Sequence, residues 1–332
     1  MKRHKYIYIF LVISIISALL YVFLWMLTTR YDLFPSDPER RAQMARAIRN
    51  ITQRKTIQLI AMVVAAVLIA STSLVFQTLT HNRILTPSLI GFDSIFITVQ
   101  TLIIFLFTSK SLFYTNIYIN FFISAGLMIF ISMLMYALIL RKNRNNLIFL
   151  LLVGMILSTL SRSLANFLQT IMNPDEFQSI VIRTEVSVSN MNTGIIIIAI
   201  PILIIILGLI VKEIKALDVM TLGESQATGL GVSYQQKMNL HLIYIAVAMS
   251  VATAMIGPIS FLGLIAVNAS RELLKTYRHR ELLILSSLIA ITFLVLGQTI
   301  IVETGYLTTV TVWMSLVGGL YMIYLILKEN KA

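Results

Sequence analysis

The segment TLGESQATGLGV, residues 221–232, interrupts an otherwise strongly apolar chain. On each side of it lie apolar runs long enough to cross a bilayer, since a span needs about 20 mostly apolar residues. Thr221 and Glu224 have the spacing of a capping box, which predicts a helix start. Gly229 and Gly231 are suited to ending a helix in the left-handed conformation. A short, capped helix is therefore expected between two membrane spans.

The composition of the whole chain indicates a membrane protein. Of its 332 residues, 58% are hydrophobic and 12% are charged, whereas a soluble domain carries about 25% charged residues. The sequence has no cysteine and only four scattered histidines, so it offers no disulfide framework and no metal-ligand spacing. The net charge of +12 points to topology and partner docking rather than to nucleic acid, because the basic residues lie between apolar runs.

Apolar segments predict an all-α, polytopic membrane protein with about ten transmembrane helices in a single domain, residues 1–332. One of them is short and follows Gly257 and Pro258, which can divide one helix into two closely apposed ones. Ten spans place both termini on the same side, and the positive-inside rule makes that side cytoplasmic. The N-terminal run is too long for a secretory signal and is expected to be retained. The segments are 6–28, 56–78, 92–108, 117–140, 147–169, 193–211, 238–256, 259–274, 282–302 and 307–327.

The loop 29–55 is an exception to this charge distribution, because it is external on this topology and yet rich in arginine. It is either a solvated or membrane-surface segment, or a docking surface whose field steers an acidic partner. An inverted topology is disfavoured, because it places the basic loops 141–144 and 271–280 outside.

The segment 213–236 is expected on the cytoplasmic face, with a second short helix at 216–220 in front of the capped one. Two such helices have too little apolar area and no basic face to anchor in lipid. They suit a groove on another protein. The alternative is an ordinary helical connector.

Four stretches of the sequence carry motifs. Residues 221–231 resemble L-G-E-x-x-A-x-x-L-G, and GPISFLGLIAVNASR (257–271) resembles G-P-I-x-F-x-G-L-x-x-P-H-x-x-R, with Val267 and Asn268 in place of Pro-His. RHRELL (278–283) is similar to D-H-R-x-L-L. FQTLTHNRILTPSLIG (76–91) resembles Q-x-x-x-x-N-P-L-A-x-P-x-x-L-G, with Arg83 and Leu85 in place of Pro and Ala. Together they resemble permeases of bacterial ABC importers of the iron-siderophore and vitamin B12 type, in the branch associated with petrobactin or anguibactin.

This resemblance implies the type II ABC permease fold of the vitamin B12 importer, in a bacterial cell membrane, with both termini cytoplasmic. It implies a second permease subunit, identical or homologous, two ATP-binding subunits inside, and a siderophore-binding protein or lipoprotein outside. ATP and Mg²⁺ belong to the partner ATPase, since this chain has no P-loop motif; no bound cofactor, no metal and no enzymatic activity are expected of it. The residues expected to couple to the ATPase are Leu222, Gly223, Glu224, Ala227, Gly229 and Gly231.

The resemblance also implies that arginines before the second span meet acidic residues of the binding protein. The family pattern is R-x-P-R. Arg54 matches its second arginine, whereas Ile51 and Gln53 replace the first arginine and the proline. Arg49, which lies nearby, is expected to take the place of the missing arginine.

Gln77, Arg162, Gly257 and Pro258 are assigned to the translocation pathway. A charged residue inside a span faces a water-filled path or a partner, so Arg162 is expected to attract anionic ferric siderophores; the alternative is that it snorkels to the outer interface. Gln77 follows a run of small residues that permits close helix approach, and it either packs around the pathway or contacts the substrate. Asp93 is expected to form a local ion pair with Arg83.

The expected function is therefore the transmembrane permease subunit of an ATP-driven importer of a ferric siderophore. Vitamin B12 and haem are alternative cargoes. A secondary transporter driven by an ion gradient is disfavoured, because it normally places ionisable groups near the bilayer midplane and these spans contain few acidic residues. A membrane scaffold explains neither the capped segment nor Arg162.

Overall fold

The computed structural model describes residues 2–28, 37–142, 147–186, 188, 191–305 and 308–329. Within these ranges every regular element is a helix. The elements are α1 (Lys2–Thr28), α2 (Pro38–Leu79), the 3-10 helix η1 (Pro87–Ile90), α3 (Phe92–Phe107), α4 (Leu112–Thr115), α5 (Ile117–Lys142), α6 (Leu147–Ile171), α7 (Pro174–Thr184), α8 (Thr193–Lys212), α9 (Ile214–Met220), α10 (Glu224–Gly229), α11 (Tyr234–Ile256), α12 (Leu262–Leu274), α13 (His279–Glu303) and α14 (Val310–Glu329).

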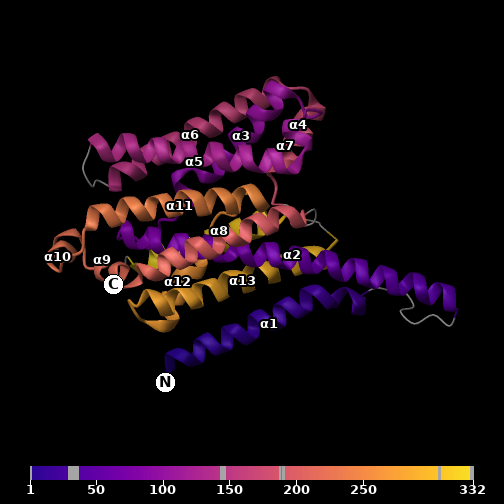
Figure 1. Ribbon diagram of the computed structural model, residues 1–332, viewed down its shortest axis with the longest axis horizontal. Coiled ribbons are helices and arrows are strands. Elements are labelled where there is room, and N and C mark those ends of the chain that lie inside the picture. The colour runs from indigo at the N-terminus through magenta and orange to yellow at the C-terminus, as the bar shows by residue number, and fades with distance from the viewer. Residues whose placement is uncertain are drawn as a thin grey trace.

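The long helices form a bundle in which α5 and α6 lie along one edge, α1 lies along the other, and α11, α2 and α13 lie between them (Figure 1). The short helices α9 and α10 are at one end of the bundle, and α4 and α7 are at the opposite end. Both chain termini point toward the end that carries α9 and α10 (Figure 1). That this end of the bundle is the cytoplasmic one stays a prediction.

Length and composition allow eight helices of the described ranges to cross a membrane: α1, α2, α5, α6, α8, α11, α13 and α14. Two further expected spans correspond to shorter helices, α3 with 16 residues and α12 with 13 residues. The all-α, polytopic architecture is thus confirmed, with eight full-length candidates and two shorter helices, of which α12 corresponds to the segment expected to be short.

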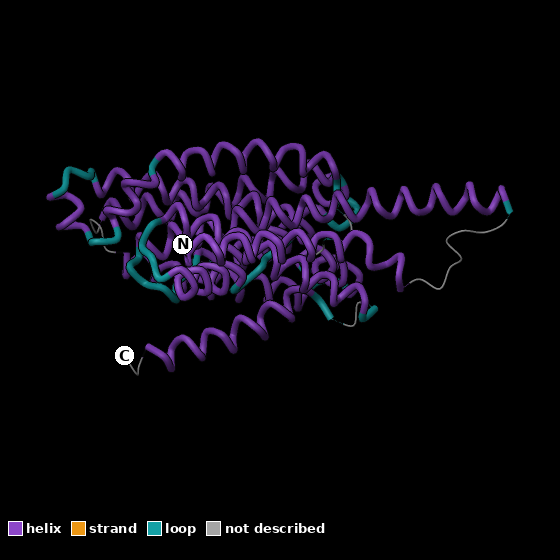
Figure 2. Tube along the Cα trace, turned by 90° about the horizontal axis from the view of Figure 1, so that it is seen from below, coloured by secondary structure: helices purple, strands orange, loops and turns teal. Residues whose placement is uncertain are grey.

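The expected external loop 29–55 is helical from residue 38 onward, because α2 continues through it for a total of 42 residues. The helix begins where Asp37 Oδ1 accepts from the backbone N–H of Glu39 at 3.3 Å, with Pro38 in the first turn. The following basic stretch has no glycine or proline and is rich in strong helix formers. Figure 2 shows it projecting as a single helix beyond the bundle. Residues 29–36 lie outside the described ranges.

The core is closely packed where α12 crosses α2. A Cβ atom added to Gly263 would overlap the hydroxyl of Ser73 and come within 2.6 Å of its Cβ. The small residues at 70–73 allow this approach, as small residues do between membrane helices.

Candidate coupling and translocation site

The α9–α10 pair rests on the bundle with one face and exposes the other. Leu217, Met220 and Ala227 are completely buried, whereas Leu222 and Leu230 are 51% and 65% exposed. Leu222 lies in the turn between the two helices and Leu230 caps the end of α10, so the exposed leucines flank α10 on both sides. Exposed apolar side chains of this kind suit helix-in-groove recognition.

The turn between the two helices differs from the predicted capping box. The Thr221 hydroxyl donates to the carbonyl of Asp218 at 2.6 Å, so it belongs to the end of α9. Gly223 is the N-cap of α10, with φ +93° and no side-chain cap. The connection is so short that the chain must reverse at a positive φ, which glycine adopts readily. Gly231 has φ +85° as expected, but Gly229 is the last helical residue and does not have a positive φ.

A hydrogen-bonded chain joins α9 to the membrane helices. Asp218 Oδ1 accepts from the backbone N–H of His279 and lies 2.7 Å from its Nδ1. On the other side of the ring, Nε2 is 2.7 Å from the hydroxyl of Thr78 near the end of α2. Because His279 is only 1% exposed, the chain Asp218–His279–Thr78 is a stiff link from α9 to α13 and α2. In the sequence His279 was recognisable only as part of the motif at 278–283. No pattern in the sequence indicated that Asp218 and Thr78 are its partners.

Two charged groups outside the spans complete the attachment of α9. Burial alone would raise the pKa of Asp218, but the hydrogen bonds and charge of His279 outweigh it and hold that pKa below its usual value. Glu213, at the start of α9, forms an ion pair with Lys237 of α11 at 2.5 Å. These contacts attach α9 to α2, α11 and α13.

The two short helices α3 and α12 begin next to each other inside the bundle. The Ser260 hydroxyl, just before α12, donates to Asp93 Oδ2 in the first turn of α3 at 2.6 Å. The start of α3 is level with the middle of α6, because Ser94 bonds Ser158 at 2.8 Å. Irregular backbone at this depth occurs where it is buried in protein or lines a cavity, and paired interrupted helices point to the binding site of a transporter.

The pathway residues predicted from sequence are only partly brought together. Gly257, with φ +92°, and Pro258 form the break before α12, beside Ser260. Arg162 is exposed on α6, close enough to Asp93 for their charges to interact. The expected pair of Asp93 with Arg83 is therefore wrong, because Arg83 instead lines a cavity together with Arg271. Gln77 lies apart from this group, toward the end of the bundle that carries α9 and α10.

The predicted docking arginines are both exposed on the projecting part of α2. Arg49 and Arg54 are five residues apart, which on a helix rotates one from the other by about 140°. They do not share a face. Arg46 lies one turn before Arg49 and does share its face, a neighbour that the loop interpretation could not show.

A family model matches residues 9–328 of the chain, and its description is the FecCD transport family. The chain belongs to the FecCD transport family. The family resemblance inferred from the four motifs is thereby confirmed, and the match covers nearly all of the sequence.

Two relatives cover most of this chain. The petrobactin import system permease protein YclO of Bacillus subtilis is 41% identical over 280 residues, 84% of this chain and 89% of that protein. FatC of Bacillus anthracis, also a petrobactin import system permease protein, is 32% identical over 283 residues, 84% of this chain and 79% of that protein.

The fold also matches a solved structure, described as an inward-facing conformation of a metal-chelate type ABC transporter. The TM-score is 0.81 at 21% identity, with 98% of this chain and 99% of that chain covered. The expected permease fold is confirmed.

Proposed function

We propose that this chain is the transmembrane permease subunit of an ATP-driven importer that carries a ferric siderophore of the petrobactin class into a bacterial cell. The petrobactin permeases among its relatives support the cargo. The observation that carries the mechanism is the α9–α10 pair, which exposes Leu222 and Leu230 and is hydrogen-bonded through Asp218 and His279 to the membrane helices. The chain guides the cargo and leaves ATP hydrolysis to its partners.

The assembly has a second permease subunit, two ATP-binding subunits and an extracytoplasmic siderophore-binding protein or lipoprotein. The end with α9, α10 and both termini faces the cytoplasm and the ATPases, in accord with the positive-inside rule. The projecting part of α2 then lies outside, where its arginines attract an acidic surface of the binding protein. ATP-driven movement of α9 and α10 rocks α2, α11 and α13 between outward-open and inward-open states, the alternating access of transporters.

Reversing the charge of Glu224, in the exposed first turn of α10, tests the proposed ATPase contact. In gentle co-purification, the amount of ATPase subunit recovered with the Glu224→Arg variant is expected to fall by about threefold or more. The reason is that a like charge or an unpaired charge at an interface weakens docking. A Glu185→Arg variant, exposed at the opposite end of the bundle, serves as the matched control and should retain the ATPase. A wild-type preparation that transports without any ATPase subunit would contradict the proposal.

Arg162 is the cation that we assign to the pathway between the two permease subunits. It lies on the exposed face of α6, near the junction of α3 and α12. In the Arg162→Gln variant, uptake of an anionic ferric siderophore should fall by about two- to fivefold at low salt, and the deficit should shrink at high salt as the charge is screened. Uptake by reconstituted transporters across a range of ionic strengths measures this. Equal uptake by the wild type and the variant at every ionic strength would contradict a role of Arg162 in the pathway and would favour a side chain that only reaches the membrane interface.

A further inference from the structure

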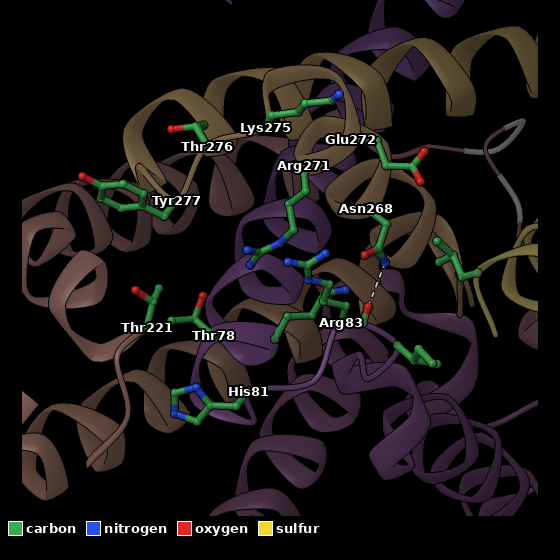
Figure 3. A pocket seen from close by; sticks show the side chains of 13 residues that line it. Thr78, His81, Arg83, Thr221, Asn268, Arg271, Glu272, Lys275, Thr276 and Tyr277 are labelled. Carbon is green, nitrogen blue, oxygen red and sulfur yellow. Dashed lines mark hydrogen bonds between the residues drawn. The ribbon is translucent and has the colours of Figure 1, made fainter. Parts of the chain in front are cut away.

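A cavity of about 780 Å³ opens at the end of the bundle that carries α9 and α10. Its walls come from the end of α2, the following turn, the end of α12 with its connection to α13, and α14 (Figure 3). The membrane helices end at this level, so the cavity lies at the depth of the lipid headgroups on that side.

The cavity contains two arginines with no partner. Figure 3 shows the guanidinium groups of Arg83 and Arg271 side by side in the cavity. Among the residues that the structure describes, neither group has a hydrogen-bonding or ion-pairing partner, and Nε of Arg271 is buried without one. Their charges repel each other. Lys275 adds a third cation to the lining, whereas the carboxylate of Glu272 points away from the two arginines (Figure 3).

A buried amide adds further unused hydrogen-bonding capacity. Gln77 lines the same cavity and is 3% exposed, and neither its Nε2 nor its Oε1 has a partner. A buried polar group without a partner destabilises the folded state. A ligand oxygen that accepts hydrogen bonds from the guanidinium groups and from Nε2 of Gln77 would satisfy these donors.

Two of the positions at which the sequence departs from the family motifs, Arg83 and Asn268, line this cavity. Asn268, at the position of the motif histidine, donates from Nδ2 to the backbone carbonyl of Arg83 at 2.8 Å. It also donates to the carbonyl of Leu264 at 3.0 Å, one turn earlier on α12. Arg83 itself occupies the position of the motif proline. The side chain of Asn268 therefore fixes the turn from which Arg83 reaches its neighbour.

We propose that this cavity binds a phosphate-bearing anion, and that in the membrane this anion is the headgroup of an anionic phospholipid. A phosphate group offers several oxygens to two guanidinium forks at once. Basic pockets between membrane helices on the cytoplasmic side suit such headgroups. Leu325 of α14 gives the cavity an apolar border on which the first part of an acyl chain can lie.

The test uses the purified full-length chain, stripped of lipid in detergent, and its thermal unfolding midpoint. Phosphatidylglycerol should raise the midpoint by about 3–6 °C more than phosphatidylcholine with the same acyl chains, because a ligand that binds only the folded state stabilises it. The Arg83→Gln variant should lose at least half of this difference, and it retains the backbone carbonyl that Asn268 binds. Arg280→Gln, exposed at the same end and outside the cavity, is the matched control and should respond like the wild type.

A separate arm with inorganic phosphate distinguishes the source of the anion. Stabilisation by phosphatidylglycerol alone supports a lipid ligand. The same shift with phosphate, lost in Arg83→Gln, supports the anion site but assigns it to a free phosphate. Equal effects of the two lipids on the wild type, or an undiminished response of Arg83→Gln, would overturn the proposal. So would an Arg83→Gln variant that responds normally to lipid but loses its ATPase subunit, since the cavity would then belong to the protein interface.

Discussion

Replacing Asp218 with alanine is expected to lower transport by more than about tenfold, with the ATPase subunits still bound. The substitution removes the acceptor for two groups of His279, a residue that is almost fully buried. Each buried donor left without a partner costs about 1–3 kcal/mol, and 1.4 kcal/mol corresponds to a factor of ten. The exposed leucines of the α9–α10 pair are unaffected. ATP hydrolysis and uptake, measured in the same proteoliposomes, should therefore become uncoupled.

The Asp218→Asn variant is the control, because its amide oxygen still accepts a hydrogen bond from the backbone of His279. It should keep most of the transport. The wild type and Asp218→Asn should differ in their response to acid, because only the wild type carries the titrating carboxyl group. The folded-state pKa of Asp218 lies below its unfolded value. The charge therefore contributes stability above the unfolded pKa of about 3.9, and this contribution is lost as the pH falls through the folded pKa. The wild type should lose more thermal stability below that pH than Asp218→Asn, and equal losses would contradict the role of the charge.

Replacing Gly263 with alanine is expected to destabilise the folded chain by about 1–3 kcal/mol, the usual range for overpacking a tight core. The added Cβ would overlap the hydroxyl of Ser73 and lie 3.3 Å from the carbonyl of Ile69. The helices α12 and α2 must then separate, or Ser73 must change its rotamer. The free energy of unfolding, measured in detergent with denaturant, would report the change.

A double-mutant cycle tests whether this contact is the cause. Ser73→Gly should offset part of the loss caused by Gly263→Ala, giving a favourable coupling energy between the two sites. Gly126→Ala on α5 is the matched control, since no atom lies within 4 Å of its added Cβ, and it should be neutral or slightly stabilising because alanine is the better helix former. Additive effects of the Gly263 and Ser73 substitutions would show that the loss has another origin.

Local information in the sequence determined the class of protein and the position of its interrupted segments. Runs of apolar residues fix which segments can cross a bilayer. The polar segment 221–232 marks α10 and its flanking turns, and Gly257 with Pro258 marks the break before α12. The family also follows from the sequence, because its motifs are short and contiguous. The helix over residues 38–55 could also have been predicted from the sequence, because this stretch is rich in strong helix formers and has no glycine or proline after Pro38. The high charge of the stretch favoured a loop instead.

The tertiary structure alone decided which side chains meet. Asp218 and His279 are 61 residues apart, Asp93 and Ser260 are 167 apart, and Thr78 is 201 residues from His279. No periodicity or spacing encodes such pairs, because they depend on how α2, α9 and α13 pack. The same holds for Arg83. Its position in the sequence suggested Asp93 as its partner, whereas in the structure Arg83 lies beside Arg271 (Figure 3). Hydrophobic length sets which helices can cross a bilayer, whereas the packing of the helices brings together Asp218 with His279, Asp93 with Ser260, and the two arginines of the cavity.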